Sequence, residues 1–131
     1  RSENIDIINK YFNKKIILID RFVDSTLAYQ HFGMGININL IKNLNKYLLK
    51  NIKISFTFLN IVNQKNLLKR LKQRKSLNRY DKFNISFYKK VQKGFMKLAK
   101  KQKNKYLLIN SNLEIDKNEK LILSKIDKLI K

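Results

Sequence analysis

The chain has 131 residues, enough for one folded domain, and we expect all of residues 1–131 to belong to one core. It has no cysteine and one histidine, which excludes disulfides, thiolate metal sites and a histidine-based zinc cluster, so any metal must be bound by oxygen ligands. The net charge of +21 resembles that of a nucleic-acid-binding protein, but lysines are spread along the whole chain, which favours a solvated basic surface.

No segment has the features of a leader or a membrane span. The apolar runs are short and interrupted by lysine, so the sequence predicts a soluble cytoplasmic protein without a membrane partner. The chain opens with Arg1 and enters a helical pattern directly. From this we expect that the sequence begins partway through a longer protein.

The first predicted elements are a helix and a strand. Residues 3–12 place isoleucines and a phenylalanine at helical spacing, and this helix is expected to end at the polar turn that follows. The run KIILID at 15–20 is continuous, apolar and too short for a helix. Such a run is typical of a strand that is buried on both faces.

Two helices are predicted next. Asp24, Ser25 and Thr26 are all residue types that cap helix N-termini, so a short helix is expected to start there and to end before the two following glycines. A second helical pattern runs from residue 38 to about residue 50.

The remaining elements continue the alternation of strands and helices. The segment at 55–61 is predicted to be a buried strand, and a helical repeat runs from 64 to 74 before a polar, basic connection. Asn84 or Ser86 is expected to cap a long helix. A third short strand is predicted at 106–110, followed by a terminal helix from Asp116.

Short apolar strands that alternate with helices predict an α/β fold with a parallel sheet. In such sheets, ligands bind beyond the carboxyl ends of the strands. Asp20 and Arg21 stand at the carboxyl end of the first predicted strand. We therefore expect a ligand site at these two residues.

Arginine is scarce, which makes its positions informative. Lysine, asparagine and isoleucine, whose codons consist almost wholly of A and T, are abundant, whereas only five of the 30 basic residues are arginine: Arg1, Arg21, Arg70, Arg74 and Arg79. Arginine binds phosphate or carboxylate through two parallel hydrogen bonds, which lysine cannot do. The retained arginines therefore predict anion binding, with ordinary surface arginine as the alternative.

At this point the residues resemble a known family. The stretch from Asp20 to Gln30, DRFVDSTLAYQ, resembles the DR(Y/F)-x-x-S-(S/T)-x-A-Y-Q signature of bacterial thymidylate kinases. Further segments follow the order of that family: a lid with its arginines, an F-x-x-x-V-x-x-G-F-x-x-L-A helix from Phe87, and the final strand with its adenine-side loop. The phosphate loop G-x-x-x-x-G-K-(S/T) does not occur in residues 1–131, and in the family it lies upstream.

The resemblance implies a fold and an activity. It implies a three-layer P-loop kinase fold that is incomplete, with the first strands missing, and a lid at about 70–83. The family transfers the γ-phosphate of ATP to dTMP with Mg²⁺, giving dTDP for dTTP biosynthesis, and implies a cytoplasmic homodimer. Because the strand carrying the phosphate loop lies between those resembling 15–20 and 55–61, residues 1–131 alone are expected to be inactive and prone to aggregate.

The resemblance also assigns residues to the dTMP side of the site. Arg21 would bind the dTMP phosphate, Asp20 would lie near Mg²⁺ and contact it through water, and Arg1 falls near the position that hydrogen-bonds thymine. The nucleoside pocket would be lined by four residues of the helix that follows: Ser25, Thr26, Tyr29 and Gln30. Of these, Tyr29 would crowd the ribose 2′ position. A strand-end salt bridge for Asp20 and Arg21, a capping role for Ser25 and a core position for Tyr29 remain the structural alternatives.

On the ATP side, the resemblance implies that Arg70 and Arg74 project together into the lid, with Arg79 following. Asn110 and Ser111 would lie near the adenine. A solvated helix face is the structural alternative for Arg70 and Arg74. Two other functions stay open: a P-loop nucleoside or nucleotide kinase with another base preference, and a basic RNA-binding module.

Overall fold

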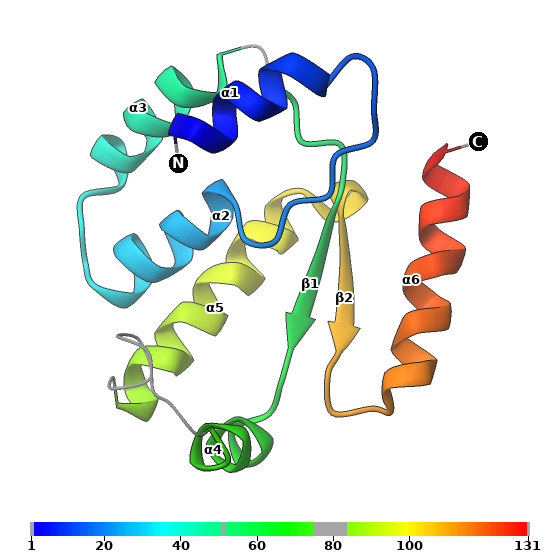
Figure 1. The fold of residues 1–131 in the computed structure, drawn as a ribbon. Coiled ribbons are helices and arrows are strands. Elements are labelled where there is room, and N and C mark those ends of the chain that lie inside the picture. Colours follow the sequence, from blue (N-terminus) through cyan, green and yellow to red (C-terminus); the bar gives the residue numbers. More distant parts are fainter. Residues whose placement is uncertain (1, 51, 75–83, 131) are drawn as a thin grey trace.

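The computed structural model describes residues 2–50, 52–74 and 84–130, which fold into helices around a small parallel sheet (Figure 1). In chain order the elements are α1 (Ser2–Tyr11), α2 (Val23–Thr26), the π-helix η1 (Leu27–Gly33), α3 (Ile38–Leu49), β1 (Thr57–Ile61), α4 (Gln64–Lys72), α5 (Ile85–Lys101), the short 3₁₀-helix η2 (Lys103–Lys105), β2 (Tyr106–Asn110) and α6 (Ile115–Ile130).

The sheet of the described residues has two strands. β1 and β2 run parallel, and their register pairs Thr57 with Tyr106 and Ile61 with Asn110. A parallel pair needs a crossover connection, and here that connection contains α4 and α5. Both carboxyl ends therefore lie at the same edge of the sheet, next to α4 (Figure 1).

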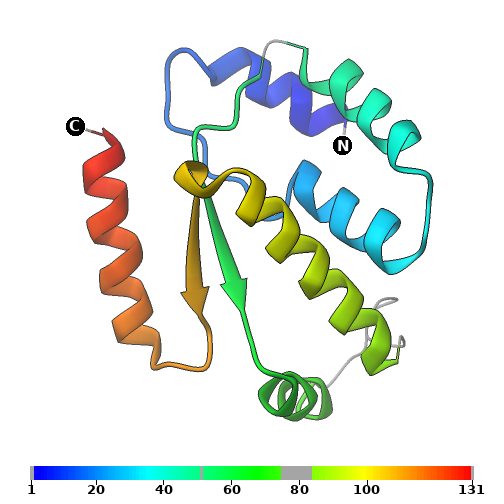
Figure 2. The same ribbon diagram turned by 180° about the vertical axis from the view of Figure 1, so that it is seen from behind.

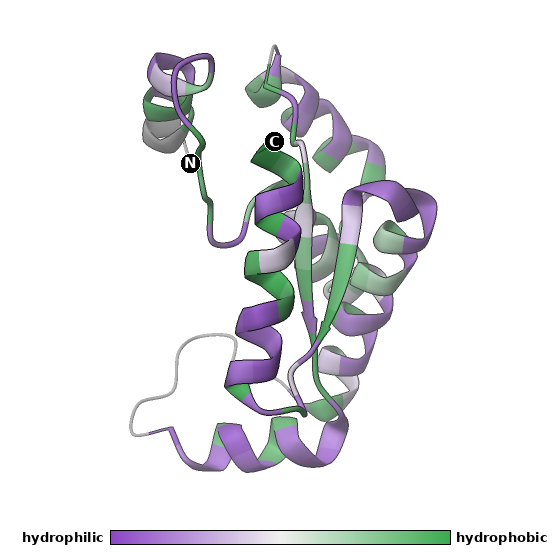
Figure 3. Ribbon diagram, turned by 90° about the vertical axis from the view of Figure 1, so that its right-hand side faces the viewer, coloured by the Kyte–Doolittle hydropathy of each residue, from purple (hydrophilic) through white to green (hydrophobic). Residues whose placement is uncertain are grey.

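Helices cover both faces of the two strands. The side view places the strands between α5 and α6 (Figure 3). Leu59 is 7% exposed and Ile109 is 1% exposed, and they point to opposite faces by strand alternation and register. Seen from behind, α5 crosses the molecule diagonally between the strands and the α2–η1 segment (Figure 2).

The best-packed part of the core lies between η1 and α5. Ala28 is fully buried there, together with Phe87 and Val91 of α5. This close approach requires glycine at the contact. A Cβ on Gly94 would lie 2.5 Å from the Phe32 ring, which is far inside van der Waals distance.

Asparagine side chains cap three of the helices. Asn37 accepts a hydrogen bond from the backbone N–H of Asn39, Asn63 accepts one from Asn66, and Asn84 accepts one from Phe87. An asparagine cap satisfies a backbone donor that has no partner within the helix. The high asparagine content therefore has a structural use at the helix starts.

Most predicted elements are confirmed. Helices occur where the 3.6-residue pattern predicts them, and the predicted strands at 55–61 and 106–110 form β1 and β2. The cap predicted at Asn84 or Ser86 is made by Asn84. The helix expected from Asp116 begins one residue earlier, at Ile115.

The predicted buried strand at 15–20 is wrong for the described structure. The segment is not assigned as a strand, and Ile16 is 66% exposed and Leu18 81% exposed. A strand needs a neighbour that pairs with its backbone N–H and C=O groups. In the described residues only β1 and β2 form a sheet, so this segment has no such neighbour.

The predicted start of the next helix is also wrong. The helix begins at Val23, and the preceding Phe22 makes no side-chain cap, so Asp24 lies in the first turn instead of before it. The helix then continues as a π-helix to Gly33. π-helical turns are rare and often lie at functional sites, and sequence periodicity does not reveal them.

No helix in the described part of the chain combines the length and apolar character that spanning a membrane requires.

Replacing Gly94 with alanine is expected to destabilise the protein by about 1–3 kcal/mol, because the new methyl group overlaps the Phe32 ring. In an unconstrained helix the same change would stabilise by up to about 1 kcal/mol, so the sign is diagnostic. The measurement is urea unfolding of the full-length gene product, the chain that contains residues 1–131 in the cell. Lys101→Ala, at an exposed position of α5, is the control, and a Gly94→Ala variant as stable as wild type would contradict this packing.

Candidate functional site

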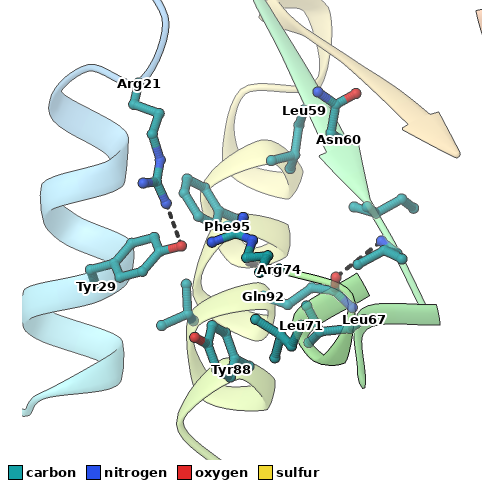
Figure 4. A pocket seen from close by; sticks show the side chains of 13 residues that line it. Arg21, Tyr29, Leu59, Asn60, Leu67, Leu71, Arg74, Tyr88, Gln92 and Phe95 are labelled. Atoms are coloured by element: carbon teal, nitrogen blue, oxygen red, sulfur yellow. Dashed lines mark hydrogen bonds between the residues drawn. The ribbon is translucent and has the colours of Figure 1, made fainter. Parts of the chain in front are cut away.

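A pocket of about 260 Å³ opens beside the carboxyl end of β1 (Figure 4). It lies between η1, α4 and α5, which is the place where parallel α/β sheets bind ligands. Its polar lining consists of two arginines and two amides: Arg21, Arg74, Asn60 and Gln92. Apolar and aromatic side chains complete the wall: Tyr29, Leu59, Ile61, Val62, Leu67, Leu71, Tyr88, Val91 and Phe95.

The charge of this pocket favours an anion. Two guanidinium groups face it, and none of its described lining residues is acidic. Arginine forks bind phosphate or carboxylate by two hydrogen bonds, and low-polarity walls strengthen such contacts. The aromatic wall gives a flat organic group a surface to stack against. The pocket therefore fits a ligand that joins an anionic group to an aromatic ring.

Arg21 has an unusual backbone conformation. Its φ is +59°, in the left-handed region that non-glycine residues rarely adopt. Such strain costs about 1–3 kcal/mol and concentrates at functional sites. The side chain reaches Tyr29, where Nη2 donates a hydrogen bond to the hydroxyl oxygen and the guanidinium carbon lies 4.7 Å from the ring centroid (Figure 4).

Tyr29 belongs to both the core and the pocket. Its ring centroid lies 6.0 Å from that of Phe87 and 6.3 Å from that of Phe95, both in edge-to-face geometry. The ring is half-buried, so the core position considered from the sequence is correct, and its hydroxyl still reaches Arg21. Core packing thus fixes the position of Tyr29, which also lines the pocket.

Arg70 and Arg74 do not converge, although they lie four residues apart on one helix. Arg74 lines the pocket. Arg70 instead donates from Nη2 to the backbone carbonyl of Ser111 at 2.5 Å. The structure thus brings Arg74 to the pocket lining, whereas Arg70 binds a carbonyl acceptor in the turn after β2.

The turn after β2 is organised by asparagine amides. Asn112 Oδ1 accepts hydrogen bonds from the backbone N–H of Asn63 at 3.1 Å and from Asn66 Nδ2 at 3.0 Å. In turn, Asn110 Oδ1 accepts a hydrogen bond from Asn112 Nδ2 at 2.7 Å. Asn110, Ser111 and Arg70 thus form a second polar group, outside the lining of the pocket that contains Arg21.

The other residues predicted from the sequence have different positions. Asp20 is exposed, and Ser25, Thr26 and Gln30 are half-buried without lining the pocket. Ser25 also does not act as the helix cap, because α2 starts before it. Arg1 and Arg79 lie outside the described residues.

Magnesium would find few protein ligands here. In the described residues no three His, Cys, Asp or Glu side chains gather closely enough to bind an ion. Mg²⁺ is commonly bound by one or two carboxylates together with substrate phosphates and water. The exposed carboxylate of Asp20, next to Arg21, fits that shared mode.

Sequence reasoning missed Gln92 and Tyr88 as pocket residues. Gln92 Oε1 accepts a hydrogen bond from the Val62 backbone N–H at 3.2 Å, which ties α5 to the end of β1 (Figure 4). A signal was available: Tyr88 and Gln92 lie four residues apart, next to the apolar face of α5 that carries Val91 and Phe95. Polar groups beside a core face are candidates for a site wall.

Fold and pocket together define an α/β protein with an arginine-lined pocket at the carboxyl end of a parallel strand. Comparison with known proteins identifies the family: the family profile described as thymidylate kinase matches residues 1–122. The chain belongs to the thymidylate kinase family. These matches do not favour the RNA-binding interpretation.

Individual relatives agree with the profile. The chain is 34% identical over 111 residues to a thymidylate kinase from Sulfurihydrogenibium sp. (strain YO3AOP1). The aligned region covers 85% of this chain and 53% of the relative. It is 37% identical over 107 residues to a thymidylate kinase from Trichodesmium erythraeum (strain IMS101), and this aligned region covers 82% of this chain and 47% of the relative. The chain thus spans about half the length of the curated relatives it matches.

A solved structure also matches. The crystal structure of thymidylate kinase from Ehrlichia chaffeensis superposes with a TM-score of 0.62 at 27% sequence identity. The match covers 99% of this chain and 61% of that one. The α/β fold expected from the sequence is thereby confirmed as that of the P-loop kinase, present in part.

Truncating Tyr29 to alanine is expected to cost about 2–4 kcal/mol of unfolding free energy, because the ring fills space between Phe87 and Phe95. Tyr29→Phe keeps the ring and should cost about 1 kcal/mol or less. Tyr47→Ala is the matched control, since Tyr47 is 70% exposed and its loss should change little. Equal effects of Tyr29→Ala and Tyr47→Ala in urea unfolding would show that Tyr29 is not a core residue.

Proposed function

We propose that this chain contributes to a thymidylate kinase, which transfers the γ-phosphate of ATP to dTMP and forms dTDP. The observation that carries the proposal is the pocket with Arg21, Arg74 and Tyr29 at the carboxyl end of β1, in a chain of this family. Its two cations and aromatic wall suit a nucleoside monophosphate. The whole domain is a P-loop kinase domain to which residues 1–131 contribute the carboxyl-terminal portion.

Arg21 is the proposed ligand of the dTMP phosphate. Its fork is held over the Tyr29 ring, so the donors are oriented before the ligand arrives. Phosphoryl transfer depends mainly on positioning two polyanions and on stabilising the charge that builds between them. An arginine fixed in a strained turn meets both needs.

The nucleoside would lie along the aromatic wall. Tyr29 stands next to Arg21, so its hydroxyl would crowd a ribose 2′ oxygen and favour deoxyribose. Ser25, Thr26 and Gln30 follow on the same helical segment, half-buried, and reach the nucleoside only if the pocket tightens around it. The family also places Arg1 near thymine.

The ATP side is proposed for the residues after β1 and β2. Arg74 faces the pocket, and Arg70 holds the Ser111 carbonyl beside Asn110. In the proposed kinase, Arg70, Arg74 and Arg79 belong to the lid at about 70–83. Their positive charge would balance the charge on the transferring group.

Mg²⁺, when bound, neutralises phosphate charge. Asp20 is the proposed residue for its hydration shell, through a water molecule, because its carboxylate is exposed next to Arg21. The proposed enzyme is cytoplasmic and homodimeric, as the family resemblance implies.

The full-length gene product is expected to phosphorylate dTMP in preference to dUMP, dAMP and thymidine, measured as ADP release with each acceptor. Arg21→Lys should raise the KM for dTMP by about tenfold or more, because lysine cannot form the two parallel bonds. The KM for ATP should change much less. Lys101→Ala, at an exposed position of α5, is the control.

Several outcomes would reject the proposal. Equal rates with all acceptors would indicate a kinase of another base preference. Steeply salt-dependent RNA binding without ATP turnover would indicate the RNA-binding alternative.

Residues 1–131 alone are expected to show no dTMP phosphorylation and to aggregate, because Ile16, Leu18 and Ile19 expose apolar surface and the two-stranded sheet of the described residues leaves strand edges unpaired. Size-exclusion chromatography with light scattering and the same kinase assay provide the measurements. The full-length gene product is the control. A monomeric 131-residue chain with a cooperative melting transition would contradict this expectation.

A further inference from the structure

The strained turn at Arg21 needs support from its surroundings. Its left-handed φ of +59° persists only if contacts on both sides of the turn hold the chain in place. On the carboxyl side, η1 packs against α5 through Ala28 and Phe32. On the amino side, residues 16–20 belong to neither a helix nor a strand. The question is what connects this turn to the sheet.

Asp24 and Tyr106 make that connection. The Tyr106 hydroxyl donates a hydrogen bond to Asp24 Oδ2, in a partly buried position and across a sequence separation of 82 residues. Asp24 lies in the first turn of α2, three residues after Arg21. Tyr106 is the first residue of β2 and pairs with Thr57 of β1. In Figures 1 and 2 the segment leading into α2 passes the amino ends of both strands.

The chemistry of the pair keeps the Tyr106 hydroxyl protonated, and so able to donate, at ordinary pH. Burial raises the pKa of the Tyr106 hydroxyl well above its usual value, and the hydrogen bond and negative charge of Asp24 raise it further. A hydrogen bond with the Thr57 side chain lowers it by less. The hydroxyl therefore stays protonated and remains a donor to the carboxylate, which is a strong type of hydrogen bond.

We propose that Asp24 and Tyr106 are positioning residues of the pocket, which hold the start of α2 against the sheet so that Arg21 faces the ligand anion. Neither residue lines the pocket, and the Asp24 carboxylate is bound by the Tyr106 hydroxyl, so their proposed role is to position Arg21 and not to contact the ligand. The inference rests on the proposed function, because it names what places the phosphate-binding arginine of that same site.

The hydrogen bond from Tyr106 also keeps the Asp24 carboxylate away from the Arg21 guanidinium. The Asp24 carboxylate is bound by Tyr106, and the Arg21 guanidinium stacks on and hydrogen-bonds Tyr29. A carboxylate released from Tyr106, only three residues from Arg21, could compete with a phosphate for the arginine fork. Binding by Tyr106 thus separates the acid from the cation that the ligand needs.

The test compares three variants of the full-length gene product. Tyr106→Phe and Asp24→Ala remove the hydrogen bond, whereas Asp24→Asn keeps an oxygen that can accept it. Because the lost bond is of the charged type, the first two should weaken dTMP binding about tenfold or more in isothermal titration calorimetry, and Asp24→Asn should stay within about threefold.

A second measurement does not depend on the ligand. In hydrogen–deuterium exchange, the amides of residues 22–27 should exchange faster in Tyr106→Phe and Asp24→Ala, while those of residues 87–99 in α5 stay as in wild type. Asp24→Asn should match wild type in both segments. This local pattern distinguishes positioning from general loss of stability.

Two controls complete the design. Tyr47→Phe changes an exposed tyrosine, and Asn45→Ala changes a buried amide of α3 that lines no part of the pocket. Asn45→Ala should lower stability without weakening dTMP binding. If Tyr106→Phe binds dTMP as wild type does, or leaves residues 22–27 unchanged, the inference is overturned. If wild type itself binds no dTMP, the proposed function fails, and the exchange data alone decide whether the pair holds the Arg21 turn.

Discussion

The contact between η1 and α5 is the interaction on which the rest of the site depends. It is possible because Gly94 leaves room for the Phe32 ring and Gly33 leaves room for Phe87, whose Cε2 atom would lie 2.6 Å from an added Cβ. This contact buries Ala28 completely and sets Tyr29 between two phenylalanine rings. The pocket wall and the core are therefore the same surface, and a change that loosens the packing also moves the residues facing the ligand.

The sheet explains why the described structure exposes so much apolar surface. Two parallel strands bury Leu59 and Ile109, but the apolar segment before α2 pairs with neither of them. α6 buries none of its residues fully, and Ile115 is 82% exposed. Parallel sheets are normally covered on both faces and are built from more than two strands. This surface agrees with a chain that spans about half the length of its relatives.

The scarcity of arginine proved informative, but only in part. Arg21 and Arg74 line the pocket, where two planar guanidinium groups could each offer an anion two hydrogen bonds. Arg70 has a different role, because it donates to a backbone carbonyl in the turn after β2. Arginine thus marks places where several donors are needed in a fixed plane, and the acceptor can belong to a ligand or to the protein itself. Asparagine likewise caps helices and organises that turn.

The sequence alone determined most of the helices, the two strands β1 and β2, the cap at Asn84 and the membership in a kinase family, because these follow from periodicity, local hydrogen bonding and a contiguous signature. The tertiary structure decided the rest. Whether residues 15–20 form a strand depends on a neighbour from elsewhere in the chain, and whether Arg70 reaches the pocket depends on an acceptor 41 residues away. The left-handed turn at Arg21, the π-helix and the bond between Asp24 and Tyr106 likewise arise from packing between distant segments. Local patterns cannot encode which distant groups meet, since that is set by how the whole chain closes its core.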